Sequence, residues 1–221
     1  MRHSKACGRA NNVSYPALFV LTCLTVAVTA PTQPVWADPF TPHHSRSFVH
    51  PSTDQVALPM RAWIRFCERH PRECVVDLQG PRLAQLTRDT WQTIVRINRE
   101  VNESIRPQTD REHWGVGDRW TFAEDGYGDC EDFQLVKRRR LVEAGLPRRA
   151  LLMTVVTDET GSGHAVLMVR TSGGDLILDN KRNAALPWHQ TGYTFVKREA
   201  DDGAGWAWLG VPASQTVATA Q

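Results

Sequence analysis

Residues 129–179 read DCEDFQLVKRRRLVEAGLPRRALLMTVVTDETGSGHAVLMVRTSGGDLILD, and this stretch decides the fold. Its first part predicts a helix over residues 129–144, with Asp129 as N-cap and with Gly145 and Pro147 as stop signals. The hydrophobic period then changes from about 3.6 residues to about 2, which predicts three short strands. They cover residues 151–157, 164–170 and 176–179. A helix followed by an antiparallel sheet is typical of the α+β class.

The flanking sequence adds elements around this core. The turn-rich residues 106–128 predict a loop, and a loop of that length inside a compact domain is usually functional. Trp120 in this loop is expected in the core rather than in the wall of a cleft, and residues 137–140 are expected on a solvated helix face. Further helices are expected over residues 56–68 and 81–105, and further strands over residues 193–197 and 206–211.

The N-terminal segment has the layout of a secretory signal peptide. Arg2, Lys5 and Arg9 form a positively charged leader. Residues 17–30 (ALFVLTCLTVAVTA) then carry no charge, and residues 35–37 (VWA) offer a small-x-small cleavage site. The uncharged run is shorter than the roughly 20 residues that span a bilayer, although an uncleaved anchor helix stays the alternative. A periplasmic or secreted location is therefore predicted.

The domain organisation follows from this layout. Residues 1–37 are predicted to be the signal peptide, and residues 38–54, rich in Pro, Ser and His, a flexible lead-in. Residues 55–215 are predicted to form one domain. The composition, 41% apolar and 23% charged, is that of an ordinary globular protein and excludes fibrous or wholly disordered classes.

The charge balance argues against nucleic acid as a partner. The whole chain has a net charge of +2, but the basic excess lies in the leader. Without the leader, 23 basic residues stand against 24 acidic ones, a net charge of −1. A face that neutralises phosphates is therefore not expected.

The cysteines indicate one disulfide and one unpaired thiol. Cys7 and Cys23 belong to the signal peptide. Cys67 and Cys74 lie close together in FCERHPREC, so an oxidising compartment favours a disulfide between them, with two unpaired buried thiols as the alternative. A zinc site is disfavoured, because no second Cys or His pair stands at ligand spacing. Cys130 is left without a partner, which makes it a candidate for reactivity.

Cys130 is placed where a nucleophilic thiol could be activated. It falls in the first turn of its predicted helix, where unpaired N–H groups and the helix dipole lower a thiol pKa. A thiol nucleophile also needs a base, and the base needs an orienting acceptor. His164 begins one predicted strand and Asp179 ends the next. A turn near Ser172 places Asp179 opposite residues 164–168, within hydrogen-bonding reach of His164.

These motifs together resemble a known family. The sequence resembles the bacterial transglutaminase-like cysteine proteinases in three motifs: GDCEDF at 128–133, GHAVL at 163–167 and LDN at 178–180. The likeness runs from about Cys67 through Asn180. It implies a papain/transglutaminase-like core, with the nucleophile at a helix N-terminus packed on an antiparallel sheet.

The resemblance also implies roles and partners. Cys130 would be the nucleophile, His164 the general base and then acid, and Asp179 the residue that orients His164. The best-known members are periplasmic proteases that release adhesins, which implies a cysteine endopeptidase with a protein substrate such as a surface adhesin, and a membrane-bound regulator. Two alternatives stay open: transglutaminase-type acyl transfer by the same residues, and a non-catalytic periplasmic binding module of the same fold.

Three carboxylates surround the candidate nucleophile. Asp129, Glu131 and Asp132 should raise the pKa of Cys130, because negative charge disfavours a thiolate. Helix capping or a hard cation would relieve this effect. Adhesin-releasing members bind calcium at a similar motif, so the resemblance implies a calcium site at Asp129 and Glu131, with capping and solvation as the alternative. The chemistry itself is expected to require no cofactor.

Overall fold

The computed structural model describes residues 55–203 and 205–209. The predicted signal peptide (1–37) and lead-in (38–54) lie outside the described residues, as does the end of the predicted domain (210–215). No helix among the described residues is long and apolar enough to cross a membrane.

The described helices surround the one that begins at Cys130. The α-helices are α1 (Arg61–Arg69), α2 (Pro71–Cys74), α3 (Arg88–Ser104), α4 (Asp110–Trp114) and α5 (Cys130–Glu143). Two short 3-10 helices, η1 (Arg148–Ala150) and η2 (Trp188–Gln190), accompany the strands. The disulfide between Cys67 and Cys74 is present and joins α1 to α2.

One antiparallel sheet carries the rest of the fold. Its strand order is β1-β9-β8-β4-β5-β6-β7. The strands are β1 (Val56–Ala57), β4 (Leu151–Thr157), β5 (Gly163–Thr171), β6 (Gly174–Asp179), β7 (Arg182–Pro187), β8 (Thr194–Glu199) and β9 (Trp206–Trp208). A separate parallel pair joins β2 (Arg106–Pro107) to β3 (Tyr127–Gly128). Helices on one face of an antiparallel sheet confirm the α+β class.

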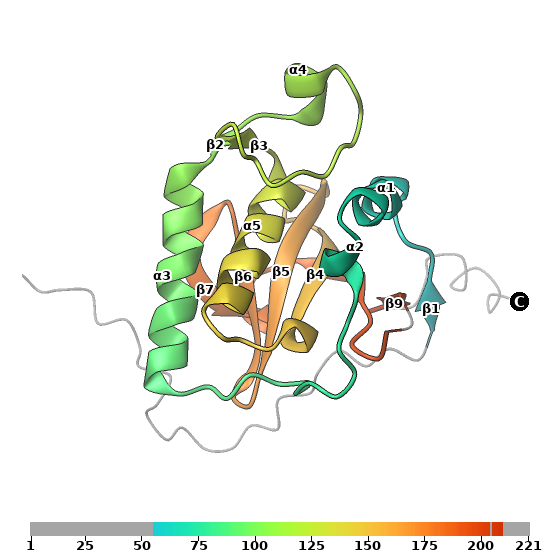
Figure 1. Ribbon diagram of the computed structural model, residues 1–221. Helices are drawn as coiled ribbons and strands as arrows, with labels where there is room; N and C mark the ends of the chain where they lie inside the picture. The colour runs from blue at the N-terminus through green and yellow to red at the C-terminus, as the bar shows by residue number, and fades with distance from the viewer. Residues whose placement is uncertain (1–54, 204, 210–221) are drawn as a thin grey trace, which may run out of the picture. The chain divides into compact units, whose positions relative to one another are not determined.

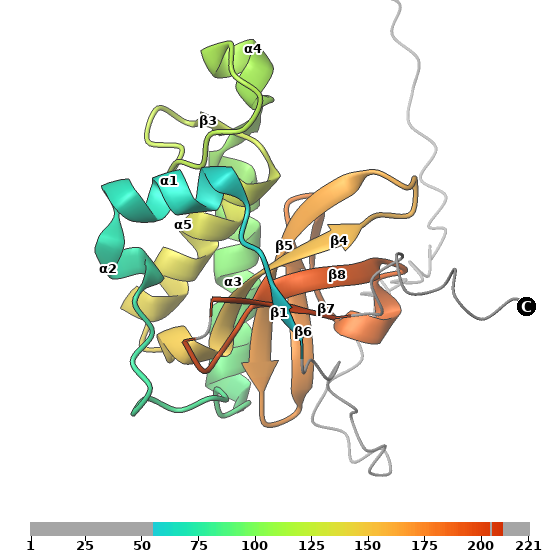
Figure 2. The same cartoon turned by 90° about the vertical axis from the view of Figure 1, so that its right-hand side faces the viewer.

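The core explains why the central strands are apolar on both faces. Figures 1 and 2 show α5 and α3 lying along one face of the sheet, with α5 over the central strands β4–β6. Leu151 and Met153 of β4 face these helices and join the main core, which includes Phe133 of α5. Leu152 and Val156 alternate with them and form a second apolar cluster. A one-residue slip would exchange the two sets between the faces of the sheet, so both clusters would have to repack.

A buried carboxylate fastens α5 to the sheet. Glu199 of β8 is buried and accepts hydrogen bonds from Arg138 of α5 at 3.0 and 3.1 Å and from the Met153 N–H at 3.0 Å. Arg148 and the indole of Trp63 bond to the same carboxylate. Breaking a buried charge pair of this kind costs about 3–5 kcal/mol, so Glu199 holds α1, α5 and β4 in one arrangement.

The structure corrects several predicted boundaries. The first helix starts at Arg61 rather than at residue 56, because residues 56–57 pair with β9 as a strand. The second starts at Arg88 rather than at residue 81, because the Thr87 hydroxyl accepts from Thr90 N–H and caps it there. Residues 106–128 are not a plain loop, since they contain β2, α4 and β3.

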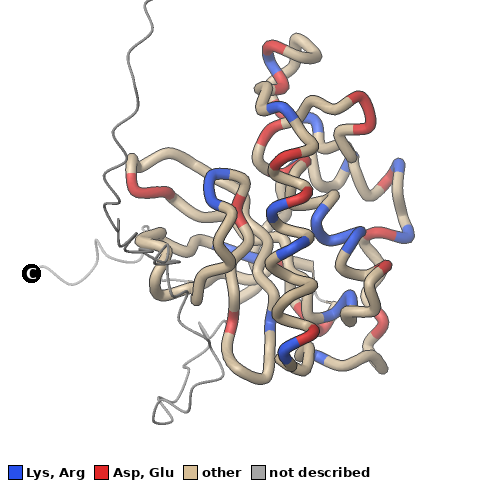
Figure 3. The backbone as a smooth tube through the Cα atoms, turned by 90° about the vertical axis from the view of Figure 1, so that its left-hand side faces the viewer, with Lys and Arg blue, Asp and Glu red and all other residues tan. Residues whose placement is uncertain are grey.

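The structure also confirms some predictions and adds an element. The predicted register of the β5–β6 hairpin is confirmed, because Leu167 pairs with Leu178. Strand β7 was not predicted. Trp120 is buried, which confirms its place in the core. The solvated face expected over residues 137–140 is wrong for Lys137 and Arg138, both of which have no exposed surface. Figure 3 shows basic and acidic positions mixed along the described backbone.

Candidate active site

The start of α5 lies against the start of β5. The Sγ atom of Cys130 accepts a hydrogen bond from the N–H of Ala165 at 3.4 Å. Ala165 directly follows His164, and peptide geometry therefore places Sγ within about 6 Å of the His164 Cα. The structure thus places the predicted thiol beside the backbone of His164, 34 residues further along the chain, counted from positions 130 and 164.

His164 and Asp179 form a buried pair across the β5–β6 hairpin. Nε2 of His164 lies 2.8 Å from Oδ1 of Asp179, and both side chains are only 4% exposed. Because Asp179 occupies Nε2, Nδ1 is the ring nitrogen that remains for the thiol. The His164–Asp179 pair thus lies on the hairpin whose Ala165 N–H bonds to the Cys130 sulfur.

Asp179 is held in place from three directions. Besides His164, the Lys181 N–H donates to Oδ1 at 3.0 Å and the Tyr193 hydroxyl donates to Oδ2 at 2.6 Å. Burial acts to raise the pKa of Asp179, but these hydrogen bonds outweigh it and lower the pKa to about 2. The Tyr193 ring also meets the His164 ring edge-on, with centroids 5.9 Å apart. No sequence motif marked Tyr193, which reaches this site only through the sheet.

The thiol itself is in an environment that disfavours ionisation. Burial raises the pKa of Cys130 well above its ordinary value, and the negative charges of Glu131 and Asp129 raise it further. The thiol also donates toward Glu131 Oε2 at 3.4 Å. The prediction that the helix start lowers the pKa of Cys130 is therefore wrong for the net effect. Desolvation and the two carboxylates raise this pKa by more than the helix start lowers it. The predicted effect of the carboxylates is confirmed for Glu131 and Asp129, whereas Asp132 is not among the groups that raise the pKa of Cys130.

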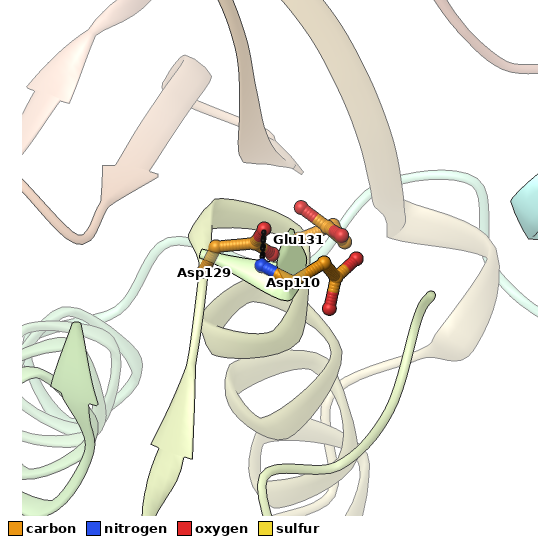
Figure 4. Close-up of side chains that lie close together, drawn as sticks. All are labelled: Asp110, Asp129 and Glu131. Atoms are coloured by element: carbon orange, nitrogen blue, oxygen red, sulfur yellow. Dashed lines mark hydrogen bonds between the residues drawn. The ribbon is translucent and has the colours of Figure 1, made fainter. Parts of the chain in front are cut away.

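Three carboxylates gather beside the thiol. Asp110, Asp129 and Glu131 each offer an oxygen, and these atoms lie within 4.8 Å of one another. Figure 4 shows the three side chains close together at the start of α5, and the Asp110 N–H donates to Asp129 Oδ2 at 3.3 Å. Asp129 and Glu131 are the predicted pair, whereas Asp110 comes from α4 and was not predicted. The Thr109-to-Glu112 capping box signals the helix α4, but nothing in the sequence signals its proximity to Asp129.

The electrostatics of this cluster favour a positive charge. Burial raises the pKa of Glu131 well above its ordinary value, and its hydrogen bond with Asp129 raises it further. Burial also raises the pKa of Asp110. Asp129 Oδ1 is buried with no hydrogen-bond partner among the described residues. Side-chain capping does not account for Asp129, since its carboxylate makes no cap hydrogen bond to α5.

Asp132 ties the preceding loop to the helix. Its Oδ1 accepts from the Thr121 N–H at 2.6 Å, and burial raises its pKa to about 8. The residue packs directly on the backbone of Gly128: a Cβ at position 128 would lie 2.7 Å from Asp132 Oδ2 and 2.8 Å from its Cβ. Glycine is therefore required two residues before Cys130 so that Asp132 can turn back to Thr121.

Comparison with known proteins agrees with these features. A family model described as bacterial transglutaminase-like cysteine proteinase matches residues 52–214. Among solved structures, Legionella pneumophila LapG in its calcium-bound form is similar at 28% identity and a TM-score of 0.44, over 48% of this chain and 63% of that one. EGTA-treated LapG is similar at 27% identity and a TM-score of 0.43, over 49% and 62%. The match thus spans less than two thirds of the LapG chains. No match was found among curated proteins.

Gly128→Ala should displace the start of α5. The added methyl meets the Asp132 side chain at 2.7 Å, so the Asp132–Thr121 hydrogen bond is lost or strained, and the free energy of unfolding should fall by about 1–3 kcal/mol. Urea unfolding measures this. Gly117→Ala is the matched control, because a Cβ there meets no atom within 4 Å. Equal stabilities of the two variants would contradict the packing described.

Proposed function

The chain belongs to the bacterial transglutaminase-like cysteine proteinase family, and we propose that it hydrolyses peptide bonds in a protein substrate through Cys130, His164 and Asp179. The observation that carries the proposal is the hydrogen-bonded His164–Asp179 pair lying next to the thiol at the start of α5. These three groups come from α5, β5 and β6.

The first half of the reaction forms an acyl-enzyme. Nδ1 of His164 takes the proton of the Cys130 thiol as Sγ attacks the carbonyl carbon of the scissile peptide. The tetrahedral intermediate collapses when His164 returns that proton to the leaving nitrogen. The C–N bond breaks, the amine product leaves, and the acyl group stays on Sγ as a thioester.

The second half releases the acid. His164 takes a proton from a water molecule, whose oxygen attacks the thioester carbon. The C–S bond breaks, the peptide leaves with a new carboxyl group, and the proton returns to Cys130. In both halves the developing oxyanion needs donors, and the N–H groups of the first turn of α5, that of Cys130 included, have no partner within the helix.

Proton transfer to His164 allows Cys130 to react although the pKa of its thiol is raised. A thiol that is poorly ionised alone can still react when the base accepts its proton during attack. Asp179 supports this step because its low pKa keeps it ionised, so it stabilises the imidazolium that forms.

The acidic cluster fits calcium. Asp110, Asp129 and Glu131 would hold the ion through carboxylate oxygens, the ligands that calcium prefers, and the unpartnered Asp129 Oδ1 would gain a partner. A bound calcium ion would supply positive charge beside the thiol. It would offset the negative charges that raise the pKa of Cys130 and would fasten α4 to the start of α5.

Location and substrate complete the proposal. The leader at residues 1–37 and the Cys67–Cys74 disulfide support export to the periplasm or beyond. The family resemblance supports a surface adhesin as the protein substrate and a membrane-bound protein as the regulator.

Substitution of the three site residues should abolish proteolysis of cell-surface proteins. Cys130→Ser and His164→Ala should each slow fragment release by at least about 1,000-fold, because they act as one unit. Asp179→Asn should also slow fragment release strongly. The measurement is mass spectrometry of fragments released from the surface proteins of the source organism, with the exposed Arg99→Ala as control.

Two outcomes would contradict this. Undiminished fragment release by the Cys130→Ser variant would show that Cys130 is not the nucleophile. Products that carry an added amine in place of a new carboxyl group would show acyl transfer instead.

Calcium should stabilise the protein through Asp110. Binding to the folded state alone raises its stability by about 2.7 kcal/mol at a hundredfold excess over Kd, so the melting temperature should rise with calcium and fall with EGTA. Asp110→Asn should lose most of this response, whereas the exposed Glu124→Gln should keep it. A melting temperature of the native protein that does not change with calcium or EGTA would rule out the calcium site.

A further inference from the structure

A basic hollow opens between α1 and the loop that follows α4. Its volume is about 590 Å³, and four arginines line it against a single acidic residue. The arginines are Arg61, Arg65, Arg69 and Arg119, and the acid is Asp118. All five residues are exposed. We call this feature the arginine hollow.

The first three arginines come from one face of α1. They are four residues apart, and side chains at this spacing lie above one another on a helix. Ala62 and Phe66 are the residues by which α1 is buried, so the fold does not need the arginines for packing. The helix is nevertheless fastened to the loop, because Arg69 donates to the Trp120 carbonyl at 2.8 Å.

The guanidinium groups of the arginine hollow lack acidic partners. None of the four forms an ion pair with a carboxylate of the described residues. Elsewhere in the fold arginines are paired: Arg138 and Arg148 with Glu199, and Arg82 and Arg170 with Asp201. The positive charge of the hollow is therefore available to a ligand.

Arg119 and Asp118 face the same hollow with different contacts. The Arg119 guanidinium lies over the Trp114 ring, 4.2 Å from its centroid, which holds it by a cation–π contact without neutralising it. Asp118 accepts from Trp120 Nε1 at 3.0 Å. One carboxylate cannot balance four guanidinium groups, and each guanidinium offers a planar fork of donors that matches a carboxylate.

The arginine hollow adjoins the candidate active site. The Arg119 N–H donates to Asp110 Oδ2, and Asp110 offers an oxygen within 4.8 Å of one from Glu131. Glu131 in turn accepts from the Cys130 thiol at 3.4 Å. Figures 1 and 2 show α1 beside the end at which α5 begins. An extended peptide covers about 3.3 Å per residue, so a chain bound at Cys130 would reach the hollow within a few residues.

A polypeptide fits the arginine hollow better than other anionic partners do. A bilayer surface is too broad to enter a hollow. Nucleic acid binding needs a basic excess, and the chain beyond its leader has none. The family to which the chain belongs consists of cysteine proteinases, which act on polypeptides.

We propose that the arginine hollow binds an Asp- and Glu-rich segment of the protein substrate that flanks the scissile bond. The inference rests on the proposed function, because it assigns the segment to the substrate. Carboxylates of the segment would pair with Arg61 and Arg65, which make no hydrogen bond or ion pair with another described side chain. The hollow would thus select substrates by charge and align them on Cys130.

Fluorescence anisotropy with the Cys130→Ser protein tests the binding. A labelled Gly-Ser peptide that carries a run of Glu should bind, and more weakly as salt is raised, whereas the same peptide with Gln in place of Glu should not. The double variant Arg61→Gln, Arg65→Gln should weaken binding at least about fivefold, because half of the guanidinium groups are removed. The matched control is Arg96→Gln, Arg99→Gln, which removes the same charge from the exposed side of α3 and should bind as the parent does.

Three results would overturn the proposal. The first is equal binding of the Glu and Gln peptides, and the second is an equal loss in the two double variants. The third is tighter binding to phosphatidylglycerol vesicles than to the Glu peptide, which would assign the hollow to a membrane surface.

The sequences of fragments released by the native protein test the assignment to the substrate. Asp and Glu should be enriched on one side of the cleavage sites, and sites without such enrichment would contradict the assignment. The peptide titration needs no proteolysis, so failure of the peptidase proposal would be seen separately.

Discussion

The packing of the first turn of α5 against the β5–β6 hairpin is the constraint on which the site depends. It brings the Cys130 sulfur to 3.4 Å from the Ala165 N–H, next to the residue that supplies the imidazole. The hairpin in turn sets the His164–Asp179 pair at 2.8 Å. Glu199 secures the far part of α5 through Arg138, and Asp132 secures its beginning through Thr121. The geometry of the site is thus fixed by buried polar contacts at both ends of one helix.

The charges around the site shift the pKa values of Cys130 and Asp179 in opposite directions. Burial and the carboxylates of Glu131 and Asp129 raise the pKa of Cys130, whereas hydrogen bonds lower the pKa of Asp179 beside the imidazole. Reaction requires the thiol to give up its proton and the imidazole to accept it. A calcium ion held by the acidic cluster would help, because it would supply positive charge beside the thiol.

The sequence predicted what depends on local order along the chain. Helix stop signals at Gly145 and Pro147 and the turn near Ser172 predict α5 and the hairpin register, and with them the neighbourhood of His164 and Asp179. Tyr193 and Asp110 could not be found in that way. Each reaches the site through tertiary packing: Tyr193 across the sheet, and Asp110 from a helix in a presumed loop. The burial of Lys137 was missed as well, because the basic run suggested that this face of α5 was solvated.

The most direct test of the account is the rate at which iodoacetamide alkylates Cys130 as a function of pH. If His164 accepts the thiol proton, the native protein reacts at neutral pH and His164→Ala reacts at least about tenfold more slowly there. Labelling should also require the folded protein. Equal rates in the two proteins, with alkylation only above the ordinary thiol pKa of 9.0, would show that the imidazole does not act on this sulfur.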